Sequence, residues 1–154
     1  MYVEPYLFFD GRCEEALAFY RTAIGAETTF LIRFKDSPEP PQPGSGCGGP
    51  GMEDKVMHAL FRIGDTAIMA SDGRCEGRPH FQGFALTISV KDEDEADRVF
   101  ARLGEGGQVQ MPLAKTFFSP RFGMLADRFG VGWMVIVEQK EIQSGSTTGE
   151  RVRA

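Results

Sequence analysis

The sequence lacks the features that would tie the protein to nucleic acid, a membrane or export. Its 154 residues hold 17 Lys or Arg and 22 Asp or Glu, a formal net charge of −5, and the basic residues form no cluster. A nucleic-acid partner needs a basic face, so we expect none. The longest apolar runs are too short to span a bilayer. The opening residues MYVEPYLFF do not have the pattern of a secretory signal, and we expect a cytoplasmic protein.

Cysteine is scarce as well. Cys13, Cys47 and Cys75 are an odd number, they are widely spaced, and no C-x-x-C pair occurs. This spacing excludes a zinc ribbon and a thioredoxin-like redox site. We interpret the three residues as reduced thiols of a cytosolic protein.

A phosphate-binding loop is also missing, although one stretch imitates it. Residues 44–49 read GSGCGG and match G-x-G-x-x-G, inside the Pro- and Gly-rich segment 36–54. The dinucleotide role requires a strand before the motif and a helix after it, whereas prolines flank this stretch. We therefore predict no cofactor, and no methyltransferase that holds its methyl donor on such a loop. The segment 36–54 is either a lid over a pocket or a disordered loop.

The sequence does contain an orderly run of strands and helices, with 42% apolar residues and 13 Phe. A helix begins at Asp10 or Gly11 and ends at Gly25, which fits the C′ position. Gly64 and Asp65 alone separate two of the predicted strands, which indicates a tight hairpin. The strands predicted in this half from apolar patterning and β-branched or aromatic residues are 3–9, 28–34, 56–64 and 66–72.

The same order recurs in the second half of the chain. Asp92 and Glu95 have the spacing of a capping box at the start of a helix that Gly104 ends. The two copies are offset by roughly 80 residues, which indicates an internal repeat. The strands predicted here are 84–90, 108–116, 122–128 and 133–139. The sequence thus predicts an α+β fold of two tandem βαβββ modules, with module one at 1–72, a linker at 73–83 and module two at 84–140. Together they form a single domain, 1–140, followed by a polar tail, 141–154.

A duplicated βαβββ unit resembles the vicinal-oxygen-chelate superfamily of glyoxalases, bleomycin-resistance proteins and dioxygenases. The stretches ALAFYRTAIGAE and ADRFGVGWMVIVE resemble its first and closing motifs. More narrowly, PYLFFDG, MHALFRIG, IMASD and DRFGVGWMV resemble the PhnB-like branch, which has also been labelled demethylubiquinone methyltransferase-like. The resemblance implies a glyoxalase-like curved mixed sheet around a small-molecule cleft. It also implies a homodimer that completes its cavities by pairing modules.

The resemblance further indicates where the superfamily's metal ligands would stand. In metal-using members, His, Glu or Gln side chains on the first and last strands of each module hold a divalent ion that acts as a Lewis acid. The matching positions here are Pro5, Met69, Ala85 and Met134, or, after a slip of one residue, Glu4, Ala70, Phe84 or Val135. Pro and Ala have no donor, and thioether sulfur suits hard ions poorly, so we predict no metal site.

Two methionines and a histidine on these strands have more than one interpretation. Met69 and Met134 form either an apolar pocket floor or core packing. Strand alternation places His58 and Arg62 on the face opposite the apolar face of their strand, toward the cleft. His58 there is a candidate general base or anion contact, or a hydrogen-bonded structural residue. Arg62 either binds an anionic ligand or neutralises a neighbouring carboxylate such as Asp72.

Other candidate ligand contacts lie at a strand end and among aromatic residues. Ser71 and Asp72 end the fourth predicted strand. They are either polar contacts to a ligand or turn residues. Phe117, Phe118 and Phe122 are candidates, together with Trp133, for the wall of an apolar pocket. The alternatives for these rings are core packing and a dimer contact.

The sequence supports three functional hypotheses and does not decide whether the protein is an enzyme. The first is a PhnB-like protein that binds a small-molecule ligand without the superfamily's metal. The second is a divalent-metal lyase, isomerase or dioxygenase with unusual ligands such as His58, Asp72 and Glu138. The third is a resistance protein that sequesters a drug between two subunits.

Overall fold

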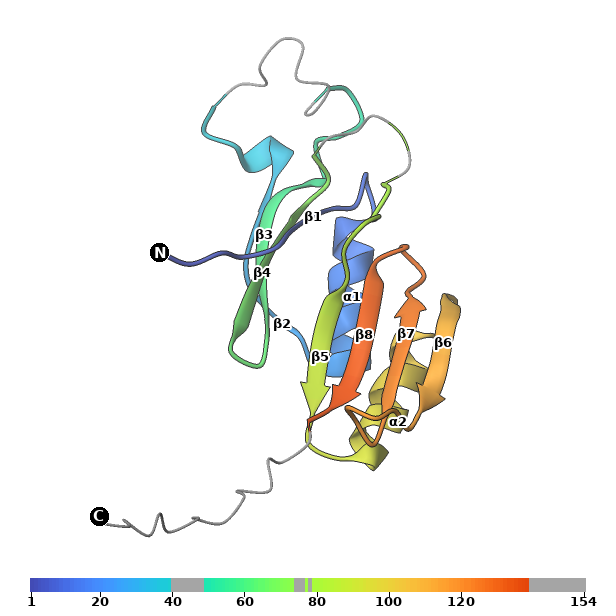
Figure 1. Ribbon diagram of the computed structural model, residues 1–154. Coiled ribbons are helices and arrows are strands. Elements are labelled where there is room, and N and C mark those ends of the chain that lie inside the picture. Colours follow the sequence, from blue (N-terminus) through green and yellow to red (C-terminus); the bar gives the residue numbers. More distant parts are fainter. Residues whose placement is uncertain (40–48, 74–76, 78, 139–154) are drawn as a thin grey trace, which may run out of the picture.

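Each half of the chain folds into a strand, a helix and three further strands, as predicted. The computed structural model describes residues 1–39, 49–73, 77 and 79–138, so most of the motif at 44–49 and the whole tail 141–154 lie outside it. Module one comprises β1 (Tyr6–Phe8), α1 (Cys13–Ile24), β2 (Glu27–Arg33), the short 3-10 helix η1 (Phe34–Asp36), β3 (Val56–Ile63) and β4 (Thr66–Ser71). Module two comprises β5 (Leu86–Val90), α2 (Glu93–Leu103), β6 (Gln108–Ala114), β7 (Phe122–Ala126) and β8 (Gly132–Val137) (Figure 1).

The strands form two separate four-stranded sheets rather than one continuous sheet. Sheet A has the order β1-β4-β3-β2 and sheet B the order β5-β8-β7-β6. In each sheet the first strand pairs parallel with the last, and the remaining pairs are antiparallel. The second sheet therefore repeats the topology of the first, and the predicted α+β class and modular repeat are confirmed.

The predicted signals at Gly25 and at Asp92 and Glu95 place their helix ends correctly. The predicted start of α1 at Asp10 or Gly11 is wrong, because both residues have a positive φ and the helix begins at Cys13. Gly25 has a φ of 70° and ends α1 in the left-handed conformation. The Asp92 carboxylate accepts the Glu95 N–H at 2.8 Å, and the Glu95 carboxylate accepts the Lys91 N–H at 3.1 Å. Gly64, with a φ of 55°, forms the tight β3–β4 hairpin. Local sequence chemistry thus sets these ends, because each terminus leaves unpaired backbone groups that a cap must satisfy.

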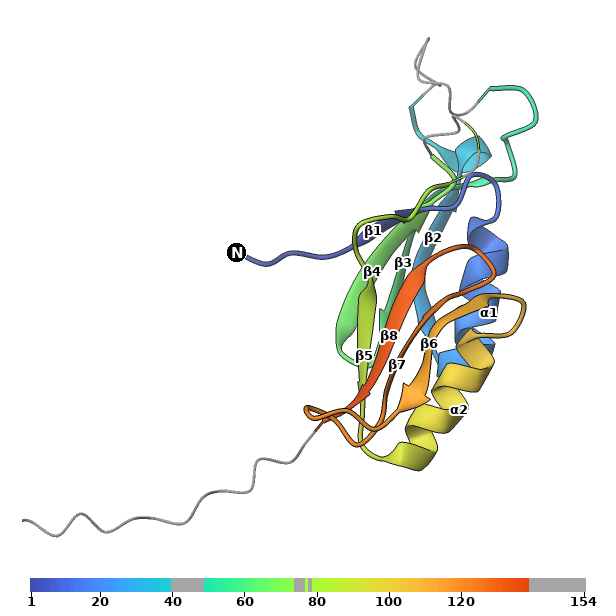
Figure 2. The same ribbon diagram turned by 45° about the vertical axis from the view of Figure 1, so that its right-hand side comes forward.

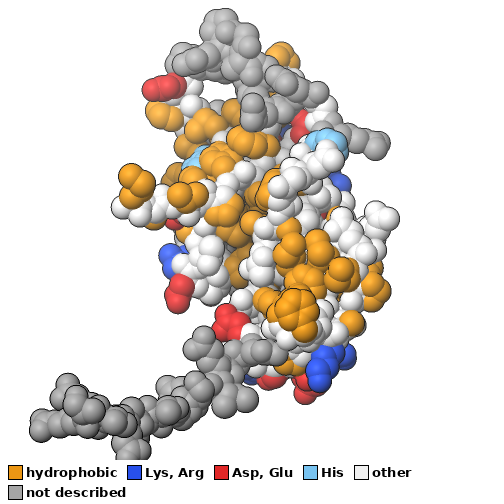
Figure 3. Space-filling model, in the orientation of Figure 1, with side chains coloured by type: hydrophobic (Ala, Val, Ile, Leu, Met, Phe, Trp, Pro, Cys, Tyr) orange, Lys and Arg blue, Asp and Glu red, His pale blue; other side chains and the backbone are white. Residues whose placement is uncertain are grey.

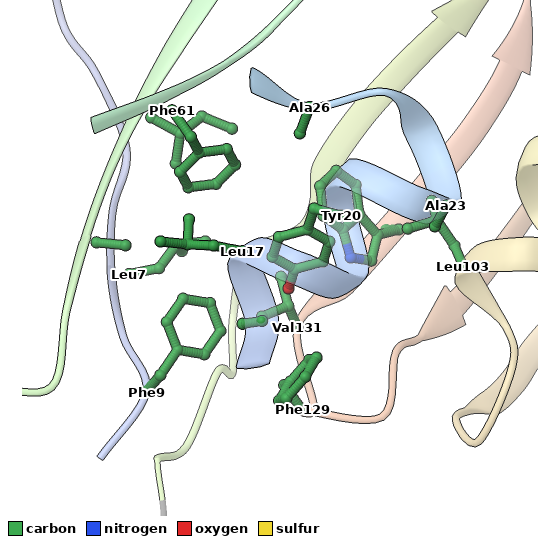
Figure 4. Packing of buried hydrophobic residues seen from close by; sticks show 14 of the residues in the cluster. Leu7, Phe9, Leu17, Tyr20, Ala23, Ala26, Phe61, Leu103, Phe129 and Val131 are labelled. Carbon is green, nitrogen blue, oxygen red and sulfur yellow. The ribbon is translucent and has the colours of Figure 1, made fainter. Parts of the chain in front are cut away.

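The two helices lie against each other on one side of the sheets (Figure 2). Residues of both modules form one buried apolar cluster beneath them. Tyr20 of α1 lies near its centre, with its ring 5.8 Å from Phe61 of sheet A and 5.5 Å from Trp133 of sheet B (Figure 4). The core is therefore shared by the two modules. Neither helix of the described chain is long and apolar enough to cross a membrane.

A buried carboxylate ties the modules together. Asp127 is 3% exposed, and its Oδ2 accepts the Tyr20 hydroxyl at 2.7 Å and the Trp133 indole N–H at 2.8 Å. Its Oδ1 accepts the backbone N–H groups of Phe129 and Val131. Burial, and then the Asp127 charge, raise the pKa of Tyr20 well above its ordinary value, so the hydroxyl stays a donor. Four donors thus converge on one carboxylate, as a buried charge requires.

Each sheet packs one face on the helices and leaves the other face uncovered. Alternation turns Leu7, Ala59 and Phe61 inward from sheet A, and Leu125 and Trp133 inward from sheet B. The side chains at the alternate positions of the same strands point away from the helices. Figure 3 shows hydrophobic side chains over both sheets on the side that is turned to the viewer. We refer to these two surfaces as open face A and open face B.

Candidate functional site

Open face A carries a row of apolar and aromatic side chains across all four strands of sheet A. The register places Phe30 beside Leu60, Leu60 beside Met69, and Met69 beside Tyr6. Tyr6 and Phe30 are exposed, at 37% and 50%. Large apolar groups in contact with water are a common mark of a binding surface when they adjoin one another.

A histidine lies within this aromatic group. The Tyr6 hydroxyl lies 3.0 Å from Nδ1 of His58. The Tyr6 ring stacks on Phe8 with centroids 4.7 Å apart, and the Phe30 ring lies 6.1 Å from the His58 ring. The predicted orientation of His58 is confirmed, because Ala59 and Phe61 on the opposite face of β3 are buried in the core. His58 is therefore a polar group in aromatic surroundings, positioned by a tyrosine.

Arg62 lies on the same face of β3, at the hairpin end. Its guanidinium donates to the Asp65 carbonyl at 2.8 Å and lies 4.0 Å from the Asp65 carboxylate. The alternative that Arg62 neutralises a neighbouring carboxylate agrees with its contact to Asp65 in the turn. The suggested partner, Asp72, is wrong, because Asp72 follows the other end of β4. The role of Arg62 as a ligand contact stays a prediction.

Asp72 is a structural residue in this chain. It is 1% exposed, and its Oδ1 accepts the N–H groups of Gly11 and Cys13 while its Oδ2 accepts the N–H of Val56. It thus binds donors at the start of α1, where a negative charge also favours the helix dipole. Ser71 is buried too, and its hydroxyl accepts the Gly73 N–H at 3.1 Å. These contacts agree with the turn role considered for the pair, and a ligand contact stays a prediction.

Cys13, at the same helix start, has no sign of an active thiol. It is fully buried. Burial, followed by the charges of Asp72 and Glu14, raises the pKa of the Cys13 thiol far above its ordinary value. The thiolate form that a nucleophile requires is therefore strongly disfavoured.

Open face B is apolar and has fewer polar groups. The register places Met111 beside Met124, Met124 beside Met134, and Met134 beside Thr87. Phe118 links the exposed Phe117 to Phe122, with centroids 5.1 Å apart in both contacts. Met134 thus lies on the surface of its sheet, as Met69 does on sheet A, so neither is a fully buried core residue.

Trp133 does not join the three phenylalanines in one wall. It points to the helix side of sheet B, is 1% exposed and donates to Asp127. Phe122 and its neighbours lie on the opposite face of the same sheet, because adjacent strand residues alternate. The expected four-ring wall is therefore wrong for a single chain, and Trp133 belongs to the shared core.

The positions that correspond to the superfamily's metal ligands hold no competent donors. Pro5 and Met69 are neighbours, with the Met69 N–H donating to the Pro5 carbonyl at 2.9 Å. Ala85 precedes β5, and Met134 lies in β8. Within the described ranges, no three His, Cys, Asp or Glu side chains come together as a possible metal site. The alternative set of His58, Asp72 and Glu138 is thus not assembled there, and the residues present do not fit the superfamily's ion.

Two hollows formed by described residues lie away from open face A. One, of about 690 Å³, is lined by Phe9, Asp10, Arg12, Arg128 and Phe129 among others. Its Arg12 forms a paired contact with Glu15 and lies over Phe129, so this cation is already engaged. A second hollow, of about 520 Å³, follows the junction of the modules and has mostly aliphatic walls. The first hollow has aromatic and charged walls, and it differs from open face A in that it has no histidine among the described residues of its lining.

Sequence reasoning missed Tyr6, Phe8 and Phe30 as site residues. The signal was present for the first two, because Tyr6 and Phe8 alternate with the buried Leu7 and Phe9. The prediction for residues 3–9 treats them as one apolar run and does not separate the side chains that face the core from those that face outward. The contact with His58 joins strands that are not adjacent in sheet A, and local patterning does not report such a contact.

Comparisons with known proteins cover most of the chain. A family model described as 3-demethylubiquinone-9 3-methyltransferase matches residues 2–136. Protein YjdN of Escherichia coli K12 is 34% identical over 147 residues, which are 93% of this chain and 100% of YjdN. Protein PA1353 of Pseudomonas aeruginosa is 40% identical, with a TM-score of 0.77 over 91% of this chain and 99% of that one. A PhnB protein from Bacillus cereus is 28% identical, with a TM-score of 0.71 over 89% of this chain and 99% of that one.

More distant structures share the fold alone. A glyoxalase-related enzyme from Fulvimarina pelagi is 17% identical, with a TM-score of 0.58 over 90% of this chain and 88% of that one. The predicted glyoxalase-like architecture is thereby confirmed. Function at this distance has to be argued from the site itself.

Proposed function

We propose, from the premise that the chain belongs to the 3-demethylubiquinone-9 3-methyltransferase family and to its PhnB-like branch, that it binds a small and largely apolar molecule on open face A. The observation that carries the proposal is the Tyr6–His58 hydrogen bond within exposed aromatic rings. Small-molecule sites combine apolar and aromatic walls with a few placed polar groups. The proposed activity is ligand binding alone, and we assign no methyl transfer to these residues.

His58 and Arg62 are the polar handles of the proposed site, with Met69 in its floor. His58 lies among the aromatic rings, and Arg62 is four residues further along β3, on the same face. A bound molecule would therefore meet aromatic and aliphatic side chains first and a histidine at their centre. Shape and hydrogen bonds, rather than a metal ion, would hold it, because Pro5, Met69, Ala85 and Met134 have no suitable donors.

We further propose that a second copy of the chain covers the site. Open face A is uncovered in one chain, whereas sites of this kind enclose most of their ligand. On the side of open face B, Met111, Phe117 and Phe118 are exposed, and adjoining exposed apolar side chains are a common mark of a protein–protein contact. A stable pairing would need to bury about 800 Å² on each subunit. In a homodimer, open face B of one subunit would lie over open face A of the other. This pairing would enclose the ligand and cover the apolar side chains of open face B.

A ligand panel tests the function. Purified protein is titrated with apolar and aromatic small molecules, and binding is measured by calorimetry for the unmodified chain, His58→Ala and His80→Ala. His80 is the control, because it is the second of two histidines and lies exposed in the linker. We expect His58→Ala alone to weaken binding. Equal affinities for all three proteins would contradict the proposal.

Metal analysis of the same preparation tests the metal-free part. We expect no divalent ion in stoichiometric amount after purification without chelator. A stoichiometric ion that is lost on substitution of His58 would show that the site uses a metal with ligands other than those of the superfamily.

A further inference from the structure

We infer that the ligand of open face A is a flat aromatic molecule with a carbonyl oxygen, and that Nε2–H of His58 donates to that oxygen. The inference rests on the proposed function and adds the chemical class of the ligand. It is carried by the contact between Tyr6 and His58, the aromatic rings around that contact and the charges beside it.

We assign the outward-facing donor nitrogen of His58 from its contact with Tyr6. The hydroxyl of Tyr6 lies 3.0 Å from Nδ1. A phenol donates readily and an unprotonated imidazole nitrogen accepts readily, so we assign the hydrogen of this bond to Tyr6. In a neutral imidazole the other nitrogen, Nε2, then carries the ring proton. The ring therefore presents a donor to its surroundings.

That donor has no protein acceptor among the residues that the structure describes. Tyr6 is the hydrogen-bond partner found for His58 in that part of the chain, and the ring is half-buried. A polar group in apolar surroundings gains most from a matching partner, because an unmet donor is costly once water is displaced. A ligand that covers His58 should therefore bring an acceptor with it.

The surface beside His58 is aromatic on two sides, and the His58 ring is tilted by 36° against Tyr6 and by 49° against Phe30. Tyr6 and Phe8 stack at an interplanar angle of 25°, and the Tyr6 and His58 centroids are 5.6 Å apart. Phe30 lies on the other side, 6.1 Å from the His58 ring. Planar rings pack on such a surface in offset or edge contacts. A flat aromatic ligand would therefore meet these rings while its oxygen reaches Nε2.

The charges on this face favour a neutral acceptor. Arg62 is the cation nearest in sequence to His58 on open face A, and its cross-strand partner on β2 is Glu27. Arg62 also lies 4.0 Å from the Asp65 carboxylate. Arg62 thus has one carboxylate at 4.0 Å and a second at the paired position of β2. A ketone oxygen needs no net positive field, whereas a carboxylate would.

Two isosteric probes test the inference. 2-Acetonaphthone and 2-isopropenylnaphthalene have the same shape, and they differ in that the first has a carbonyl oxygen where the second has a methylene carbon. Binding is measured by calorimetry, and the bound position is mapped by amide chemical shifts. We expect the ketone to bind about tenfold more tightly, the effect of one hydrogen bond in an apolar site. We also expect the largest shifts near Tyr6, Phe30 and His58.

Substitutions separate the hydrogen bond from packing. His58→Phe should remove the preference for the ketone and leave the affinity of the hydrocarbon within about twofold, since a ring is kept. His58→Gln, which keeps an amide donor, should retain part of the preference. His80→Phe is the matched control and should keep the full preference.

The outcomes distinguish the inference from the proposed function. If both probes bind equally at open face A, the inference is wrong and the function stands. If neither probe binds there, both are overturned. A nitrogen NMR spectrum of the two histidine rings gives a second readout that needs no variant. We expect His58 to carry its proton on Nε2, and a ring protonated on Nδ1 alone would overturn the inference.

Discussion

The two modules have the same topology, yet their open faces differ in chemistry. Open face A places His58 and Tyr6 among stacked rings, whereas the matching row of open face B runs through Met111, Met124 and Met134. One face can therefore orient a ligand through directed hydrogen bonds, and the other offers mainly apolar contact. The difference shows that a repeated fold leaves its uncovered surfaces free to take separate roles.

The modules also differ in how each uses a buried carboxylate. Asp72 accepts backbone N–H groups within module one. Asp127 in module two accepts two backbone N–H groups, the Trp133 indole and the Tyr20 hydroxyl of the other module. The first carboxylate fixes a helix start, and the second joins the two halves.

The largest expected effect comes from removing the carboxylate that joins the modules. Asp127→Ala should lower the free energy of unfolding by about 4 kcal/mol, because four buried donors lose their acceptor. Asp72→Ala should cost about 3 kcal/mol, since at least three backbone donors lose their acceptor but no contact between the modules is removed with them. Chemical denaturation followed by circular dichroism measures both. A smaller loss for Asp127→Ala than for Asp72→Ala would contradict this ranking.

A charge on open face B should break the proposed dimer and leave the fold intact. Met124→Asp places a carboxylate where the partner subunit would lie, and desolvating it should weaken association at least about tenfold. Thr22→Asp on the exposed surface of α1 is the control. Analytical ultracentrifugation gives the dissociation constant. An unmodified chain that sediments as a monomer at all concentrations would refute the pairing.

Much of the fold could be predicted from the sequence, because the signals that set it are local. The Asp92–Glu95 capping box, Gly25 and the Gly64 hairpin each act within a few residues. The site was predicted only in part. His58 was placed on the correct face, but its contact with Tyr6 joins residues 52 apart, and the Tyr20–Asp127 bond joins residues 107 apart. Those contacts depend on which strands become neighbours, and periodicity does not report that.

Tyr6→Phe tests whether Tyr6 acts by positioning His58. The ring and its stacking on Phe8 are kept, and only the hydroxyl is lost. Affinity for 2-acetonaphthone should fall about threefold, while affinity for the hydrocarbon probe stays unchanged. Calorimetry with both probes measures the two affinities separately. A parallel loss for both probes would show a packing effect instead.

The smallest effect concerns an exposed ion pair of module one. The Arg33 guanidinium, which hydrogen-bonds Glu14 at 2.7 Å, lowers the pKa of that carboxyl. A lowered pKa means that the pair stabilises the fold above the ordinary Glu pKa and that this contribution is lost as pH falls through the folded-state pKa. Both side chains are solvated, so Glu14→Gln should change stability little at neutral pH and less still in acid. Denaturation curves measured at neutral and at acidic pH check that the stability change caused by Glu14→Gln is smaller in acid.

The most direct test of the account is a crystal structure of the protein with 2-acetonaphthone bound. We predict electron density for the naphthalene ring against Tyr6, Phe8 and Phe30, with its carbonyl oxygen within hydrogen-bond distance of Nε2 of His58 and no metal ion between them. A ligand seated in the groove between the modules, or an ion coordinated at open face A, would contradict it.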